Sequence, residues 1–297
     1  MQAAFVVLML TGGFAPCLPA WPITEIKLQG KYAGFETDDF IATAEQMPGG
    51  RKAKLLAQIK HALTISAADE TFGEVIAAAW ADFKNPKIFD PASDAIAVVT
   101  GPLSGLDIDA VRSLLDHARH CGSAKEFITK ITTGLFTSAT NRKKLEAFKA
   151  QLKKANQGAA LSEDELWQFL KCFHVLGYDL DLKSGVTLSL LKSHIGQFST
   201  VNIDDLWNAI SREVIDSNAH AGTVTRDTLP QSLRDAFKER VRREQLPAPP
   251  PAPSAPAPAP APLANLHAEA LKYLVMAGAF NEKSPADIDA IRKLING

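Results

Sequence analysis

The feature that most constrains this chain is a pair of apolar runs separated by a tight-turn signal. Residues 40–44 (FIATA) and 53–63 (AKLLAQIKHAL) are rich in apolar side chains, and Met47-Pro48-Gly49-Gly50 lies between them. Pro and Gly mark turns, and short apolar runs on either side of such a turn are typical of a β-hairpin. We therefore expect two neighbouring antiparallel strands in the first part of the chain.

The predicted hairpin carries two carboxylates where it begins and a lysine near its end. Alternate residues of a strand lie on one face, so Leu56, Gln58 and Lys60 are expected to share a face. A lysine beside an apolar core needs a partner, and Asp38 or Asp39 is the natural one. A carboxylate and a carbonyl oxygen can also hold Mg²⁺ for phosphodiester hydrolysis, with the lysine positioning water. Spacing alone favours an ordinary cross-strand ion pair over a catalytic site.

The wider pattern predicts an α/β fold. Residues 23–28 alternate as a strand does, residues 71–83 have helical spacing, and the continuous apolar run 94–100 is typical of a strand covered on both faces. After residue 107 the spacing is helical. The expected helices are 108–120, 124–135, 141–155, 162–176, 186–195, 203–216 and 228–244. Ser162 and Glu165 form a capping-box pattern at the start of one of them.

A composition change predicts the domain organisation. Residues 247–262 contain only Pro, Ala and one Ser, with nine prolines, so we expect an extended spacer of roughly 50 Å. This predicts an α/β core at 1–137, a mainly helical subdomain at 138–245, a Pro/Ala-rich linker at 246–263 and a short helical tail at 264–297. The tail is too small to form a large core of its own.

Charge and cysteine content limit the functional classes. The formal net charge of −1 gives no global field toward nucleic acid, so any basic surface must be local. Cys17, Cys121 and Cys172 are scattered and odd in number, which favours a reducing, cytoplasmic compartment over a disulfide framework. The apolar run at residues 3–10 is too short to cross a bilayer. It has no Lys or Arg before it, which favours a buried helix over a cleaved export signal.

The carboxylates, Gln58 and Lys60 also carry a family resemblance. Asp38/Asp39 followed by Gln58-x-Lys60 is similar to the PD-(D/E)XK pattern of restriction-endonuclease-like nucleases, in the variant with Gln as the acidic member. The stretches Lys31–Phe40 and Leu56–His61 resemble double-stranded-DNA endonuclease effector domains of bacterial anti-phage systems, of the CBASS-associated and STAND-fused types. Across roughly residues 2–240, the resemblance implies a restriction-endonuclease-like mixed sheet with flanking helices and a helical C-terminal half.

The resemblance implies roles for individual residues. Asp39, or Asp38, would bind the metal, Gln58 would replace the second acid, and Lys60 would be the catalytic lysine, with Mg²⁺ or Mn²⁺ as cofactor. Gln2 lies where the family often has a Tyr-Gln pair, so the chain is expected to begin inside the family's first helix. The implied partners are double-stranded DNA, a nucleotide- or phage-sensing module and further copies of the chain, without a membrane.

Two basic segments are candidates for contact with DNA phosphates. The first lies at the hairpin turn, close to the expected chemistry, and the second is one face of the helix at 141–155. The candidates are Arg51, Lys52 and Lys54 in the turn, and Arg142, Lys143, Lys149 and Lys153 in the helix. The alternative for the helix is a solvated face, and the sequence does not decide between the two.

Other motifs lead to no function. His117-x-x-His120-Cys121 lacks further zinc ligands at a usual spacing, and Ser104 is one position late for a G-x-S-x-G elbow. No P-loop occurs. With the resemblance included, we favour a metal-dependent DNA endonuclease effector of anti-phage defence. The alternative is a catalytically inactive nuclease-fold protein with an interaction or regulatory role.

Overall fold

The computed structural model describes residues 1–237, except residues 102, 135, 181, 183 and 184. The chain divides into two units, Met1–Glu244 and Gln245–Gly297. The predicted linker at 246–263 and tail at 264–297 fall in the second unit and lie outside the described residues. In the described part of the chain, no helix has the length and apolar character needed to cross a membrane.

One six-stranded mixed sheet organises the first unit, in the order β5-β4-β3-β2-β1-β6. Neighbours among β6, β1, β2 and β3 are antiparallel, whereas β3, β4 and β5 are parallel. The strands are β1 (Ile23–Leu28), β2 (Phe40–Glu45), β3 (Lys52–Lys60), β4 (Ala95–Thr100), β5 (Phe173–Gly177) and β6 (Thr223–Thr225). The predicted hairpin is therefore the β2–β3 pair, and the α/β class is confirmed.

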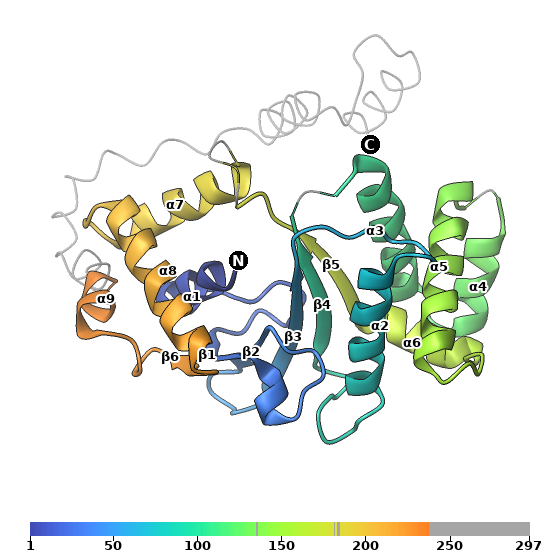
Figure 1. Cartoon of the computed structure of the whole chain (residues 1–297), viewed down its shortest axis with the longest axis horizontal. Coiled ribbons are helices and arrows are strands. Elements are labelled where there is room, and N and C mark those ends of the chain that lie inside the picture. Colours follow the sequence, from blue (N-terminus) through green and yellow to red (C-terminus); the bar gives the residue numbers. More distant parts are fainter. Residues whose placement is uncertain (102, 135, 181, 183–184, 238–297) are drawn as a thin grey trace, which may run out of the picture. The chain divides into compact units, whose positions relative to one another are not determined.

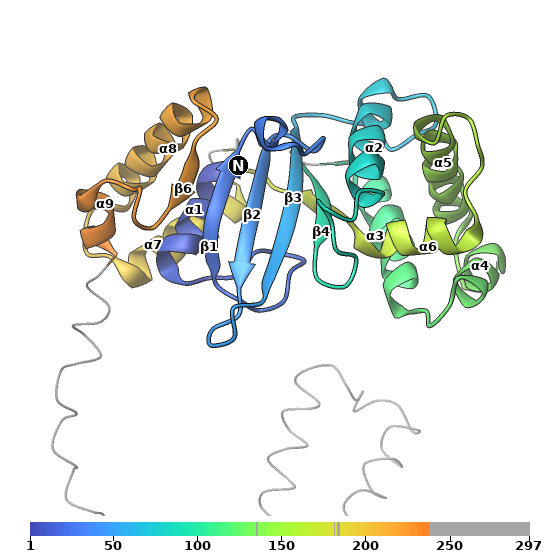
Figure 2. The ribbon, with the colours of Figure 1, turned by 90° about the horizontal axis from the view of Figure 1, so that it is seen from below.

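Helices form two layers on the two faces of this sheet, as Figures 1 and 2 show. The first, the α2–α6 layer, comprises α2 (Glu70–Phe83), α3 (Gly105–His120), α4 (Ala124–Thr132), α5 (Ala139–Ala155) and α6 (Glu163–Cys172). The second, the α1/α7–α9 layer, comprises α1 (Gln2–Thr11), α7 (Val186–Phe198), α8 (Ile203–Ala219) and α9 (Gln231–Ala236). A short 3₁₀ helix, η1 (Gly30–Ala33), precedes β2.

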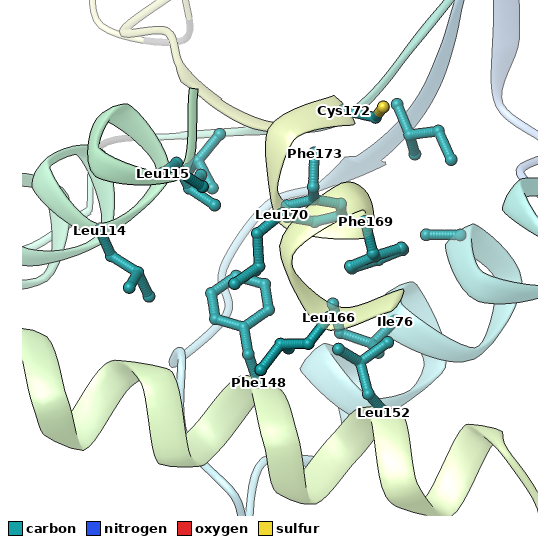
Figure 3. Packing of buried hydrophobic residues seen from close by; sticks show 14 of the residues in the cluster. Ile76, Leu114, Leu115, Phe148, Leu152, Leu166, Phe169, Leu170, Cys172 and Phe173 are labelled. Atoms are coloured by element: carbon teal, nitrogen blue, oxygen red, sulfur yellow. The ribbon is translucent and has the colours of Figure 1, made fainter. Parts of the chain in front are cut away.

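Aromatic side chains fill the core between the sheet and the α2–α6 layer. Figure 3 shows Phe148 of α5, Phe169 of α6 and Phe173 of β5 converging with leucines of α3, α5 and α6. The rings of Phe148 and Phe169 each lie 5.5–5.6 Å from the ring of Phe173, and Phe169 also contacts Trp80. Edge-to-face and stacked pairs of this kind add stabilisation beyond that of buried area.

Helix α1 fills the core on the opposite face. It is apolar all round, with Phe5, Val6 and Val7 buried, as expected of a helix inside a globular core. It ends at Gly12, whose φ of 71° is the left-handed conformation that favours glycine. The predicted buried helix is therefore correct for this segment.

The helical half contributes more to the sheet than its sequence predicts. The helix predicted over 162–176 ends at Cys172, and residues 173–177 form β5 beside β4. The capping box of Ser162 and Glu165 is present as predicted. Strand β6 also comes from this half and pairs with β1. The expected boundary after residue 137 thus falls inside one compact unit.

Candidate functional site

The antiparallel register of the hairpin brings the predicted acid, amide and lysine to one end of one face. Phe40 pairs with Ala57, so Asp39 precedes β2 at the level of Gln58. Leu56 lies in the core under the α2–α6 layer, and alternation along β3 gives Gln58 and Lys60 the same face. The shared face predicted from the sequence is therefore present.

Asp39 is bound to the backbone of the neighbouring strand. Its Oδ2 accepts a short hydrogen bond from the N–H of Ile59. Burial raises the pKa of Asp39 above its ordinary value, and the nearby Asp38 carboxylate adds to the rise. The Ile59 hydrogen bond and the Lys60 ammonium lower the pKa without reversing the net change. Asp39 is therefore a partly buried carboxylate for which a cation would be a favourable partner.

Gln58 presents a buried acceptor that has no partner among the described residues. The residue is 9% exposed, and its Oε1 accepts no hydrogen bond from any described residue. The hydroxyl of Thr100 on β4, which pairs with Lys60, is likewise buried without a partner in the described part of the chain. Buried acceptors are normally satisfied, so an unpaired amide oxygen at the level of Asp39 is a candidate ligand for a cation.

Lys60 has a different partner from the one the sequence predicts. Its Nζ lies 3.8 Å from Oε2 of Glu74, an exposed residue of α2, and no Asp38 or Asp39 oxygen lies within ion-pair distance. The expected cross-strand ion pair is thus wrong in its acidic partner. Lys60 is still close enough to Asp39 to lower its pKa. The lysine, the carboxylate and the amide therefore form one cluster.

Asp38 and Asp39 line a cavity of about 520 Å³. Its other lining residues come from the segment before β2 and from the end of α8, and are Gln29, Lys31, Tyr32 and Asn218. Gln2 of α1 donates from Nε2 to the Asp39 carbonyl oxygen at 2.9 Å and to Asn218 Oδ1 at 3.2 Å. The carboxylates therefore lie at the wall of a ligand-sized pocket.

The basic residues of the hairpin turn lie far from this cluster. Lys52 and Lys60 occupy the two ends of β3, roughly 26 Å apart along the strand. Lys54 pairs with Asp94 at 3.2 Å, Lys52 lies 3.8 Å from Glu45, and Arg51 lies over the ring of Trp21. The expectation that Arg51, Lys52 and Lys54 adjoin the chemistry is therefore wrong, because the strand separates them from it.

The basic face of α5 also points away from the hairpin. Lys144 and Gln151 bind carbonyl oxygens of the β3–α2 loop, so this side of α5 faces α2. At 3.6 residues per turn, the face holding Arg142, Lys149 and Lys153 is on the opposite side of the helix. Lys149 and Lys153 line a cavity of about 400 Å³ with residues of α4 and α6, while Lys143 is exposed. The condition under which this face would contact phosphates next to the hairpin is therefore not met.

The donor set at the hairpin consists of oxygen atoms. No group of three or more His, Cys, Asp or Glu side chains able to hold a metal ion occurs among the described residues. The carboxylates of Asp38 and Asp39 and the unpaired Gln58 amide oxygen are hard ligands, of the type that Mg²⁺ and Mn²⁺ accept. By the chemistry of their oxygen atoms, the two acids and the amide are therefore the residues that could hold a divalent cation.

Sequence reasoning missed several residues around the cavity. Lys31 and Tyr32 were part of the stretch that carries the resemblance, yet no role was predicted for them. A signal was available, since Gly30 and Gly34 flank them and an acid pair follows closely. Asn218 gives no local signal, because only the packing of α8 against α1 brings it to the pocket.

Comparison with known proteins gives a likeness to solved structures. No family model and no curated protein match the chain. Among solved structures it is similar to an Acinetobacter baumannii Cap4 SAVED/CARF-domain containing receptor with the cyclic trinucleotide 3'3'3'-cAAA, at 12% identity and a TM-score of 0.41. The match covers 76% of this chain and 44% of that one, so this chain spans less than half the length of the receptor. A likeness of this degree assigns no function.

Proposed function

We propose that this chain is a metal-dependent DNA endonuclease that hydrolyses phosphodiester bonds as an effector of anti-phage defence. The observation that carries the proposal is the clustering of Asp39, Gln58 and Lys60 at one end of one sheet face, with the Gln58 Oε1 buried and unpaired among the described residues. DNA as the substrate and defence as the setting follow from the sequence resemblance. The cluster supports the metal-dependent hydrolysis.

Each residue of the cluster has a distinct role in this proposal. Asp39 and Gln58, assisted by Asp38, hold Mg²⁺ or Mn²⁺ through oxygen atoms. When bound, the cation lowers the pKa of a water ligand and stabilises negative charge on the phosphate. The Lys60 ammonium donates hydrogen bonds to the attacking water or to a phosphate oxygen, where charge develops. Burial of Asp39 strengthens its interaction with a cation, because water screens the pair less.

The proposed partners follow from the same resemblance. They are double-stranded DNA, a nucleotide- or phage-sensing module on this or another chain, and further copies of the protein in a cytoplasmic assembly. Since Arg51, Lys52 and Lys54 lie at the far end of β3, phosphate contacts near the cut must come from other residues.

A plasmid-cleavage assay tests the proposal. The full chain is incubated with supercoiled plasmid and Mg²⁺, beside Lys60→Ala and the control Lys52→Ala at the opposite end of the same strand. We expect Lys60→Ala to lower the cleavage rate by about 10²–10⁴-fold, because it removes a group that stabilises developing charge. Lys52→Ala should cleave at the unaltered rate. Equal cleavage by all three proteins would contradict the proposal, as would no cleavage by any of them.

One observation favours the alternative of an inactive nuclease-fold protein. Lys60 is paired with Glu74 of α2, which gives it an ordinary structural partner. If that pair is its whole role, Lys60→Ala and Glu74→Ala should each change the unfolding free energy by less than about 1 kcal/mol, the usual range for exposed pairs. Cleavage would then be absent from the unaltered protein and from both variants.

A further inference from the structure

The segment before β2 displays an exposed aromatic residue at the mouth of the acidic cavity. Tyr32, in η1, is 85% exposed, and it lines the cavity together with Lys31, Asp38 and Asp39. An aromatic ring so fully in water makes little contribution to folding. Its position at a ligand-sized pocket, together with carboxylates and a lysine, makes it available for contact with a ligand.

This segment is held in place by buried hydrogen bonds. Asp82 of α2 is 2% exposed, and its two carboxylate oxygens accept from the N–H groups of Glu36 at 2.9 Å and Thr37 at 2.7 Å. The N–H of Gly30 donates to the Asp38 carbonyl oxygen at 2.6 Å. The loop is thus fastened both to α2 and to the acid pair. An exposed ring on such a support is preorganised for contact.

Close packing fixes the start of the same loop. A Cβ on Gly30 would lie 3.0 Å from the Thr37 carbonyl oxygen, so only glycine fits there without movement. Gln29 takes the left-handed φ of 51°, and its Nε2 donates to the Asn218 carbonyl oxygen at 2.6 Å. Three elements, α2, α8 and the start of β2, therefore hold Lys31 and Tyr32 beside the carboxylates.

We propose that Tyr32 is a stacking platform for one unpaired base of the nucleic acid, and that Lys31 contacts the adjacent phosphate. This inference rests on the proposed nuclease function and adds a specificity-determining element to it. Bases stack on aromatic side chains without sequence preference, and lysine supplies a point charge for phosphate. Lys31 has no ion-pair partner among the described residues, so its ammonium is available for phosphate. The substrate selected is DNA with an unstacked nucleotide next to the cut.

Binding measurements test the platform separately from cleavage. The probes are a fluorescein-labelled DNA duplex and the same duplex with a one-nucleotide gap, in Ca²⁺ and on the Lys60→Ala background. We expect the gapped probe to bind more tightly than the intact duplex. Tyr32→Ala should weaken gapped-probe binding about 10- to 100-fold and intact-duplex binding less, whereas Tyr32→Phe should keep the gapped-probe affinity within about twofold. Phe136→Ala, which removes a 58% exposed ring elsewhere, is the matched control and should change neither.

A spectroscopic signal distinguishes stacking from a structural effect. With 2-aminopurine at the unpaired position, binding should quench its fluorescence with Tyr or Phe at position 32, and leave it unquenched with Ala. Lys31→Ala should weaken both probes equally and reduce the salt dependence of binding by about one phosphate contact.

The outcomes separate this proposal from the nuclease function. Plasmid cleavage that depends on Lys60, together with Tyr32→Ala binding both probes normally, would overturn the platform alone. Ring-dependent binding of the gapped probe without any cleavage by the unaltered chain would overturn the nuclease function and support the platform. The platform would also be overturned if Tyr32→Ala weakened binding of the gapped probe and the intact duplex equally. The same holds if the protein that retains Tyr32 bound neither probe.

Discussion

The two faces of the central sheet differ in the size of the side chains that the strands present. Toward the α2–α6 layer the central strands present large side chains, and toward the α1/α7–α9 layer they present alanines interspersed with Phe40, Leu55 and Val99. The large residues are Ile41, Leu56, Ile96 and Val98, and the small ones are Ala42, Ala57, Ala95 and Ala97. Small side chains leave room for an apolar helix close to the strands, whereas large ones require a thicker core.

The helices of the two layers differ in how close together they lie in the sequence. Those of the α2–α6 layer come from one continuous stretch of chain, except that β4 interrupts it, and they share a network of aromatic contacts. The α1/α7–α9 layer combines α1 with helices that follow residue 185, and Phe5 against Phe40 is its aromatic pair with the sheet. One face is thus assembled by contacts local in sequence, and the other requires segments far apart in the chain to meet.

Removing one phenyl ring from each core tests most directly whether the two cores differ in their contribution to stability. We expect Phe169→Ala to lower the free energy of unfolding by about 4 kcal/mol and Phe5→Ala by about 3 kcal/mol, since both rings are buried. The larger loss is expected at Phe169, because its ring contacts those of Trp80, Phe83 and Phe173. Urea titration followed by circular dichroism measures both. An equal or larger loss for Phe5→Ala would show that aromatic contacts do not set the difference.

Enlarging one side chain on each face tests how tightly each core is packed. Ala97 and Val98 are neighbours in β4, both buried and on opposite faces. We expect Ala97→Leu to cost about 2–3 kcal/mol, because it adds three carbons at a fully buried position, and Val98→Leu to cost about 1 kcal/mol, because it adds only one. The same titration gives both values. If Val98→Leu is the more destabilising, the alanine-lined face is the looser one.

The smallest expected effect concerns the acid at the end of the α2–α6 face. Burial raises the pKa of Asp39, so the Asp39 carboxyl group stays protonated to a higher pH in the folded state than in the unfolded state. Stability therefore falls as pH rises through the range just above the ordinary aspartate pKa. Asp39→Asn cannot ionise, so we expect a slightly higher melting temperature than the unaltered protein at pH 7, with the difference closing below about pH 4.

Activity should change in the opposite direction for this variant. Asp39→Asn removes a proposed metal ligand, so plasmid cleavage should be lost while the fold is retained. Thermal unfolding at pH 7 and pH 4 supplies the comparison. A lower melting temperature at pH 7 would mean that the hydrogen bond from the Ile59 N–H outweighs the effect of burial.

Local sequence patterns predicted much of the fold and part of the site. The hairpin, its turn and the shared face of Gln58 and Lys60 follow from alternation, which is set within a strand. Residues 173–176 were predicted as the end of a helix, because a short apolar run fits either period. Pairing with β4 decided in favour of a strand.

The sequence by itself therefore determined the α/β class, the buried first helix and the order of the acid, amide and lysine along the hairpin. The tertiary structure alone decided that Lys60 pairs with Glu74 and that Asn218 reaches the acidic cavity. The physical reason is the separation along the chain over which each effect acts. Periodicity and turn chemistry act within a few residues, whereas the partner of a side chain is set by whichever distant segment packs beside it.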